Sequence, residues 1–222
     1  MADDPSAAVP TQDPSPFTHL AACSRMPGWK HHFGKPEGFV GAIIGHCMAF
    51  LNRQRSLRVL ALVAPSPEER ILEIGFGPGA DIRRVSRVAA FVAGVDQSRT
   101  MLQQARRRNA GALRAGRVEL QLGDAGSLPF AEASFDKAYS INSAQFWPDR
   151  LAALREIHRV LKPGGRVIIA VQPRSAGANE RTSQVTAAEL TALLAAGGFQ
   201  NVRTQLEPTR PVPTACAIAA KP

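Results

Sequence analysis

Residues 71–79 read Ile-Leu-Glu-Ile-Gly-Phe-Gly-Pro-Gly, an apolar run that leads into three closely spaced glycines. A helical pattern follows at residues 79–88. Because glycine lacks a Cβ, such a turn lets a ligand approach the backbone, and the next helix offers free N–H groups at its start. The stretch predicts a strand, a turn and a helix that bind a nucleoside-containing ligand. NAD is one candidate for this ligand, because Gly75, Gly77 and Ala80 also fit the dinucleotide-binding fingerprint.

Strand-like and helical patterns alternate along the rest of the chain. Strands are expected at residues 70–74, 90–95, 118–122, 137–141 and 166–171, and helices at residues 79–88, 98–108 and 149–161. Such alternation is typical of right-handed βαβ units and a parallel sheet. Near the end, Thr186 and Glu189 form a capping-box pattern that predicts the start of a helix. The apolar runs at residues 199–206 and 215–219 then predict an antiparallel hairpin at the sheet edge.

The amino-terminal part differs from this alternating core. Residues 1–16 contain four prolines and no apolar period, which predicts a disordered leader. Apolar side chains at helical spacing in residues 39–51 and 57–64 predict two helices. We therefore expect three parts, namely the leader at residues 1–16, a helical lid or cap segment at residues 17–64, and a core domain at residues 65–222.

Targeting signals are not evident in the sequence. The stretch between Glu37 and Arg53 is uncharged over 15 residues, which is shorter than the roughly 20 apolar residues of a membrane span. The first residues lack the basic start and apolar run of a secretory signal, so we expect a cytoplasmic protein. Three scattered cysteines and the lack of clustered Asp, Glu or His predict neither a disulfide framework nor a metal site.

The charge raises the question of an anionic partner. The chain carries 27 Lys and Arg against 18 Asp and Glu, a formal net charge of +9. A basic excess of this size is common in proteins that bind nucleic acid. Here it falls mostly on the expected outer helices and on the carboxyl-terminal third of the chain, and the basic side chains on those helices favour solvated helix faces.

Six short motifs form a series along the expected strands, helices and turns: 73–79 (Glu-Ile-Gly-Phe-Gly-Pro-Gly), 94–98 (Gly-Val-Asp-Gln-Ser), 123–125 (Gly-Asp-Ala), 128–130 (Leu-Pro-Phe), 135–136 (Phe-Asp) and 154–165 (Leu-Arg-Glu-Ile-His-Arg-Val-Leu-Lys-Pro-Gly-Gly). In order and spacing this series resembles class I S-adenosylmethionine-dependent methyltransferases over residues 57–206, most closely the small-molecule branch with ubiquinone- and menaquinone-type enzymes. The resemblance implies an α/β, Rossmann-like, doubly wound sheet of seven strands. It would be mostly parallel with an antiparallel last pair and helices on both faces.

The resemblance also implies where the cofactor S-adenosylmethionine, and its product S-adenosylhomocysteine, would bind. Asp96 would accept hydrogen bonds from both ribose hydroxyls, because a carboxylate offers several lone pairs. Asp124 and the Ala125 N–H would hold the adenine, which Gln97 would flank, and Asn142 would face the methyl-donor end. The implied cofactor-binding residues are Glu73, Gly75, Phe76, Gly77, Gly79, Asp96, Gln97, Asp124, Ala125 and Asn142.

Structural roles compete with some of these assignments. Gly79 would then belong only to a tight turn, and Asp124 would cap the next turn. Glu73 would be a strand-end carboxylate paired with a basic side chain.

Acceptor-contacting residues are expected from three segments. Residues 29–38 mix aromatic, basic and glycine residues ahead of an apolar helix, which suits a lid that contains Phe33. His31 and His32 are the candidates for a general base, which methyl transfer needs only for a neutral nucleophile. The other two segments follow the fourth and fifth strands, at the carboxyl ends where ligands bind in such sheets. The acceptor-side candidates are Phe33, Gln145, Phe146, Trp147 and Gln172, with Phe146 and Trp147 alternatively part of the core.

These residues favour methyl transfer by in-line displacement to an O or N atom of a small or medium-sized organic acceptor. Three alternatives stay open: an RNA or phospholipid methyltransferase, an NAD(P)-dependent oxidoreductase, and a non-catalytic nucleoside-binding protein. Residues 142–145 (Asn-Ser-Ala-Gln) lack the Asn-Pro-Pro-Tyr type of tetrad found in amino-methylating nucleic-acid enzymes. The positive charge keeps RNA or peripheral contact with a membrane surface among the alternatives, and the sequence gives no indication of the oligomeric state.

Overall fold

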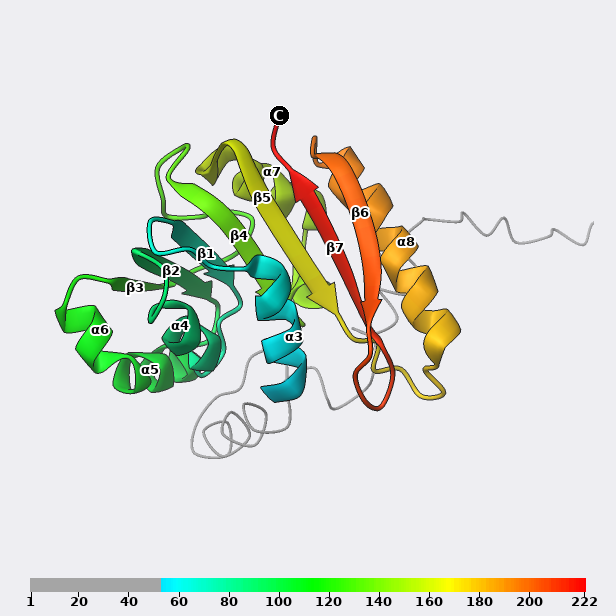
Figure 1. Cartoon of the computed structure of the whole chain (residues 1–222), viewed down its shortest axis with the longest axis horizontal. Helices are drawn as coiled ribbons and strands as arrows, with labels where there is room; N and C mark the ends of the chain where they lie inside the picture. Colours follow the sequence, from blue (N-terminus) through cyan, green and yellow to red (C-terminus); the bar gives the residue numbers. More distant parts are fainter. Residues whose placement is uncertain (1–52) are drawn as a thin grey trace, which may run out of the picture.

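The computed structural model describes residues 53–222, and these residues are built around one seven-stranded sheet (Figure 1). The strand order is β3-β2-β1-β4-β5-β7-β6. β1 to β5 run parallel, whereas β7 is antiparallel to both of its neighbours. The expected parallel sheet with an antiparallel hairpin at its edge is confirmed. The strands are β1 (Arg70–Ile74), β2 (Phe91–Asp96), β3 (Val118–Leu122), β4 (Phe135–Ile141), β5 (Leu161–Val171), β6 (Gln200–Glu207) and β7 (Thr214–Ala220).

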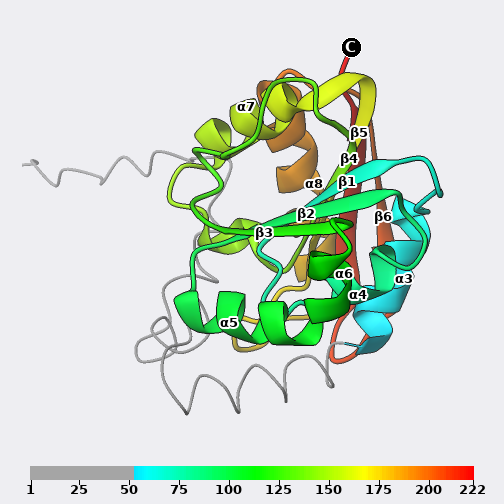
Figure 2. The ribbon, with the colours of Figure 1, turned by 90° about the vertical axis from the view of Figure 1, so that its left-hand side faces the viewer.

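Helices cover both faces of the sheet, as Figure 2 shows. On one face they bury a core that includes Leu154 and Leu190, and on the other a core that includes Val59 and Ile82. Successive side chains of a strand pack alternately into these two cores, since they point to opposite faces of the sheet. The first face carries α7 (Arg150–Val160) and α8 (Glu180–Ala196), and the second carries α3 (Arg53–Val63), α4 (Ala80–Val85), α5 (Arg99–Arg108) and α6 (Ala110–Arg114).

The expected start of the last helix is wrong. α8 begins at Glu180, and its capping box joins Asn179 to Thr182 rather than Thr186 to Glu189. Thr186 lies inside the helix, where its hydroxyl donates to the Thr182 carbonyl over 2.9 Å. Its side chain is therefore bonded to the preceding turn and caps nothing. The expected helix at residues 57–64 is confirmed, since α3 extends over Arg53–Val63.

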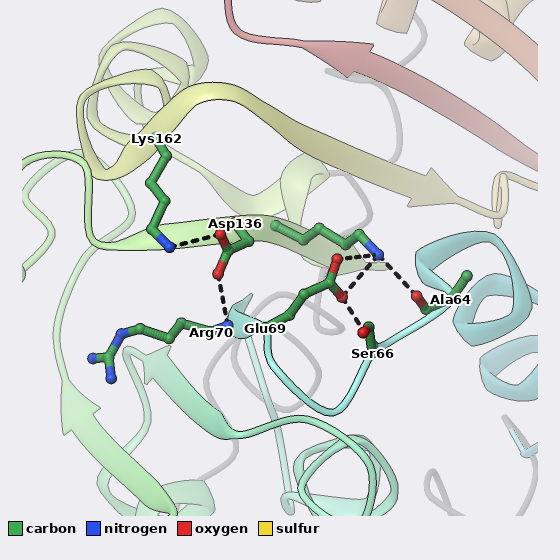
Figure 3. A network of polar contacts seen from close by, with 7 residues as sticks. Ala64, Ser66, Glu69, Arg70, Asp136 and Lys162 are labelled. Carbon is green, nitrogen blue, oxygen red and sulfur yellow. Dashed lines mark hydrogen bonds and ion pairs between the residues drawn. The ribbon is translucent and has the colours of Figure 1, made fainter.

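A polar network holds α3 and β1 against β4 at the amino ends of the strands (Figure 3). The Lys137 ammonium, almost fully buried, donates to the Ala64 carbonyl over 2.8 Å and lies 2.8 Å from a Glu69 carboxylate oxygen. Beside it, the Arg70 N–H donates to the Asp136 carboxylate over 2.8 Å. Partners on several sides offset the cost of burying the lysine charge. This end of the sheet is thereby occupied by structural contacts.

The sheet has one topological switch point. The chain passes outward from β1 to β2 and β3, and then returns to place β4 on the other side of β1. Ligands of open α/β sheets bind at the carboxyl ends of the strands beside such a point. The fold therefore points to the carboxyl ends of β1 and β4 as the centre of a site.

The leader at residues 1–16 and residues 17–52 of the expected lid segment lie outside the described residues, as do His31, His32 and Phe33. Within residues 53–222, no helix is long and apolar enough to cross a membrane.

Candidate functional site

Five polar or glycine positions lie at the carboxyl ends of the five parallel strands. Gly75 follows β1, Asp96 ends β2, Asp124 follows β3, Asn142 follows β4 and Gln172 follows β5. The strands that carry them are neighbours in the sheet. Residues that span about 100 positions of sequence are thus brought to a single edge.

The glycine-rich turn joins the ends of β1 and β4. Gly75 has a φ of +79°, and a Cβ at this position would lie 2.1 Å from the Ser143 hydroxyl oxygen. Gly77 has a φ of +52°, yet a Cβ added there would meet no atom within 4 Å. The first glycine is therefore required by close packing between two strand ends, whereas the second borders open space. An open space beside a left-handed glycine is where a ligand reaches the backbone.

Asp96 connects the turn to the end of β2. One of its carboxylate oxygens accepts the Gly77 N–H over 2.8 Å, and the other accepts the Ser98 N–H over 2.8 Å. Burial raises the pKa of Asp96, although these two backbone hydrogen bonds act in the opposite direction. Each oxygen has room for further hydrogen bonds, since a carboxylate offers about four acceptor sites. Asp96 thus organises the turn and can still accept from a ligand.

Glu73 lies on β1, two residues before Gly75, and is buried. Its carboxylate accepts the Tyr139 hydroxyl over 2.7 Å, across the β1–β4 pairing in which these two residues are opposite each other. Burial, with the nearby Asp81, raises the pKa of Glu73 well above its usual range despite the Tyr139 hydrogen bond. The hydrogen-bond partner of Glu73 is thus a tyrosine and not the basic side chain considered from the sequence.

Replacing Glu73 by glutamine is expected to stabilise the protein at neutral pH. A carboxyl whose pKa is raised on folding contributes stability at pH values below its unfolded pKa of about 4.5. This stability is lost as the pH rises from the unfolded pKa toward the folded pKa, by up to about 1.4 kcal/mol per pH unit. Glutamine has no ionisation to suppress and can still accept the Tyr139 hydroxyl. In urea unfolding, E73Q should exceed the wild type at pH 7 and approach it at pH 5. E68Q, at an exposed position, is the control, and an equal pH dependence for all three proteins would contradict the expectation.

The end of β3 is more open. Asp124 is exposed, and its carboxylate accepts the Gly126 N–H over 2.7 Å, so it does shape the turn that follows. Its other oxygen takes part in no hydrogen bond within residues 53–222. Ala125 is buried, and Gln97, which follows Asp96, is exposed. The Asp124 carboxylate can therefore serve the turn and a ligand together.

Unpaired polar atoms gather at the end of β4. Asn142 has a φ of +53°, and its side-chain oxygen accepts the Gln172 N–H over 2.8 Å. Among the described residues, the Asn142 Nδ2, the Gln145 Oε1 and the Ser140 Oγ are buried without a hydrogen-bond partner. Buried polar atoms are rarely left unpaired, because each costs about 1–3 kcal/mol. These atoms are suited to receive polar groups of a ligand.

Gln172 has a different role from the one expected. Its amide accepts a hydrogen bond from the Arg55 guanidinium and donates to the Thr209 hydroxyl over 3.0 Å and to the Val212 carbonyl over 2.6 Å. Its side chain is fully buried, so these contacts occupy it within the protein. Arg55, which the sequence analysis missed, links α3 to the end of β5. Burial and the nearby Arg174 lower the pKa of Arg55 to about 10.

The aromatic candidates divide between core and surface. Phe76 is buried and packs near Gly94, where a Cβ would lie 2.6 Å from its ring. Trp147 is also buried, and its indole N–H donates to the Ser143 hydroxyl over 3.2 Å. Phe146 is partly exposed. Within residues 53–222, no group of three His, Cys, Asp or Glu side chains could hold a metal ion.

Comparison with known proteins decides the family. A family model described as a methyltransferase domain matches residues 72–169. The methyltransferase YdaC of Bacillus subtilis, of uncharacterized function, is 31% identical over 182 residues, which cover 81% of this chain and 98% of YdaC.

The chain is a class I S-adenosylmethionine-dependent methyltransferase.

Other relatives of this methyltransferase match it over a shorter part. The O-methyltransferase resE of Aspergillus sclerotiorum is 35% identical over 124 residues, which cover 55% of this chain and 47% of resE. The demethylmenaquinone methyltransferase of Corynebacterium kroppenstedtii is 38% identical over 105 residues, covering 47% of this chain and 42% of the relative. The chain thus spans less than half the length of these two relatives. The resemblance to the menaquinone-type branch is confirmed, and the relatives favour none of the three alternatives.

A solved structure agrees in fold. The phosphoethanolamine N-methyltransferase 2 of Haemonchus contortus, bound to phosphomonomethylethanolamine and S-adenosylhomocysteine, superposes with a TM-score of 0.65 at 20% identity, covering 82% of this chain and 58% of that one. The cofactor of the methyltransferase is S-adenosylmethionine. The site suits this group, because open space at Gly77 adjoins the Asp96 carboxylate, and the unpaired Nδ2 of Asn142 lies at the end of β4.

Proposed function

We propose that the methyltransferase transfers a methyl group to a hydroxyl oxygen of a small or medium-sized organic acceptor. The observation that carries this proposal is the set of unpaired buried atoms at the end of β4, beside the glycine turn. A Gln145 Oε1 that lacks a donor matches an acceptor O–H. The O-methyltransferase among the relatives points the same way. An acceptor nitrogen with an N–H is the second candidate, since it would satisfy the same atom.

The proposed cofactor contacts follow the strand ends. Asp96 accepts from the two ribose hydroxyls while it keeps its bonds to the Gly77 and Ser98 N–H groups. The Asp124 carboxylate and the Ala125 N–H hold the adenine, and Gln97 flanks it. The turn from Gly75 to Gly79 would hold the methionine part, and Glu73 would support its ammonium through the loop or a water molecule. Phe76 contributes its backbone only, because its side chain lies in the core.

The cofactor supplies an activated methyl group on a positively charged sulfur, so the protein needs little acid or base chemistry. Its task is to align the acceptor oxygen with the methyl carbon and to exclude water. Asn142 and Gln145 orient the acceptor from the β4 side, and Phe146 provides apolar contact. His31 or His32 removes the hydroxyl proton when the nucleophile is neutral. Gln172 and Arg55 act as positioning residues, because they tie the start of α3 to the end of β5.

Methylation assays with radiolabelled S-adenosylmethionine test this proposal. The acceptors are three matched aromatic compounds that carry a hydroxyl, an amine or only hydrogen at one position. The hydroxyl compound should become labelled. Gln145→Leu should lower kcat/KM for that compound by roughly 5- to 150-fold, because the buried hydroxyl is left without a hydrogen-bond partner, and should leave cofactor affinity unchanged. Trp147→Phe serves as the control at a neighbouring core position. Methylation of the amine alone, or no loss in Q145L, would refute an oxygen acceptor held by Gln145.

The same assay addresses the proposed division of the chain into a leader at residues 1–16, a lid at residues 17–64 and a core at residues 65–222. Deletion of residues 1–16 should leave turnover and cofactor binding intact. Deletion of residues 1–38, which removes Phe33 with both histidines, should lower turnover much more than cofactor affinity. Equal turnover of the two truncated proteins would exclude a lid in this segment.

A further inference from the structure

Most of the net charge of the protein belongs to one group of helices. Between residues 80 and 117 the sequence contains nine arginines, no lysine and two aspartates, so this segment carries a formal charge of +7 against +9 for the whole chain. We call these nine side chains the arginine surface: Arg83, Arg84, Arg87, Arg99, Arg106, Arg107, Arg108, Arg114 and Arg117.

The fold places the arginine surface on one face of the molecule. α4, α5 and α6 lie together on the side of the sheet opposite α7 and α8 (Figures 1 and 2). The buried side of α5 consists of Met101, Leu102 and Ala105, so its arginines point outward. The charges of different helices are close enough to affect one another. Burial lowers the pKa of Arg108, and Arg83 and Arg84 of α4 lower it further.

Acidic side chains do not compensate this charge. Of the two aspartates in the segment, Asp96 is buried in the cofactor site and Asp81 is paired with Arg84. Arg117 donates to the Ser86 carbonyl. Within residues 53–222, the other seven arginines form no ion pair, and six of these are exposed. An uncompensated cluster repels itself, which an anionic partner would relieve.

The character of the surface favours phospholipid headgroups over RNA. Proteins that bind single-stranded RNA stack bases on exposed aromatic rings. The exposed large hydrophobic side chains among the described residues are Leu57 and Val88, and neither is aromatic. Val88 adjoins Arg87, so the surface combines arginines with one protruding aliphatic group, as in peripheral membrane contacts. Arginine forms bidentate hydrogen bonds with phosphate, the group that anionic lipids present.

We propose that the arginine surface docks the methyltransferase onto anionic phospholipid bilayers. The contact is electrostatic, because α5 buries its apolar side in the protein and has none left to insert into the bilayer. Arg99, a member of this surface, follows Asp96 by three residues, and therefore docking brings the cofactor site close to the bilayer. This inference does not depend on which atom of the acceptor is methylated.

Vesicle sedimentation of the full chain tests the proposal. The wild type should bind vesicles of phosphatidylcholine with about 30% phosphatidylglycerol, release them as salt rises, and ignore pure phosphatidylcholine. The triple variant R83Q/R87Q/R107Q should lose about 100-fold in partition coefficient, since each basic side chain near such a surface contributes about fivefold. Its cofactor affinity should not change. Its Tm should be equal or higher, because the variant removes repulsion rather than a structural contact.

The control variant R155Q/R181Q/R203Q changes the net charge equally at exposed sites on α7, α8 and β6. It should lose less than about tenfold in partition coefficient, because its charges lie away from the arginine surface. Equal losses in the two triple variants, or no binding to the anionic vesicles, would overturn the proposal. Tighter binding of a short RNA duplex or single strand than of vesicles at the same salt would replace the bilayer by RNA as the partner.

Discussion

Replacing Gly79 by alanine is expected to lower the free energy of unfolding by about 3 kcal/mol, the sum of two costs. Gly79 has a φ of +73°, a conformation that costs an L-residue roughly 1–2 kcal/mol. A Cβ there would also lie 2.6 Å from the Ala105 Cβ and 2.9 Å from the Ala105 Cα. Because one of these atoms belongs to the backbone of α5, no rotamer change can relieve the contact, and overpacking adds roughly 1–3 kcal/mol.

Gly116 provides the matched control for this prediction. It has a similar φ of +68°, but a Cβ there meets nothing within 4 Å. In urea unfolding, G116A should therefore lose only the conformational part, roughly 1–2 kcal/mol. Adding Ala105→Gly to G79A should restore part of the stability. Equal losses in G79A and G116A, or no rescue by A105G, would show that α5 does not pack against the turn as described.

Gly79 also shows what a local sequence pattern leaves undetermined about a residue. From the sequence, the third glycine belonged either to the cofactor turn or only to a tight turn. In the fold it starts α4, and its carbonyl accepts the Asn109 side-chain amide over 3.0 Å. Its packing role depends on α5, which lies about 25 residues further along the chain. A local pattern identifies such a glycine but not the helix that requires it.

The strands were predictable because each is a short apolar run buried on both faces, bounded by polar or glycine residues. The start of α8 was not, because Thr186 and Glu189 match the capping-box pattern, whereas the residues that cap the helix, Asn179 and Thr182, do not. Tertiary contacts decide between them. Glu189 is buried within α8, where its charge interacts with Arg150 of α7. Burial lowers the pKa of Arg150, and the nearby Glu189 raises it.

The site residues show the same limit. The positions at the strand ends followed from the order of motifs, but their hydrogen bonds did not. Gln172 was expected to face the acceptor because it follows β5. Its partners, Arg55 and Thr209, lie 117 and 37 residues away in sequence, and nothing local indicates that α3 and the loop before β7 converge there.

Replacing Asp96 by alanine is expected to weaken S-adenosylmethionine binding by about 1.5–3 kcal/mol, or roughly 10- to 150-fold, the range for hydrogen bonds to a charged group. The upper part of the range is expected, because the variant also releases the Gly77 and Ser98 N–H groups and so loosens the turn. Asp96→Asn keeps one acceptor oxygen and should lose less. Since burial raises the pKa of Asp96, wild-type affinity should fall on acidification at a higher pH than for an ordinary aspartate. Titration calorimetry measures all three proteins.

Asp149 separates this effect from the general loss of an aspartate. It caps α7, where its carboxylate accepts the Ala152 N–H over 2.9 Å, so D149A should lose about 1 kcal/mol of stability and no cofactor affinity. D96A should lose stability as well, because two backbone N–H groups lose their acceptor, but only D96A should also lose cofactor affinity. If D96A and D149A bound the cofactor equally well, Asp96 would be a structural residue of the turn, and the ribose would have to be held elsewhere on this edge of the sheet.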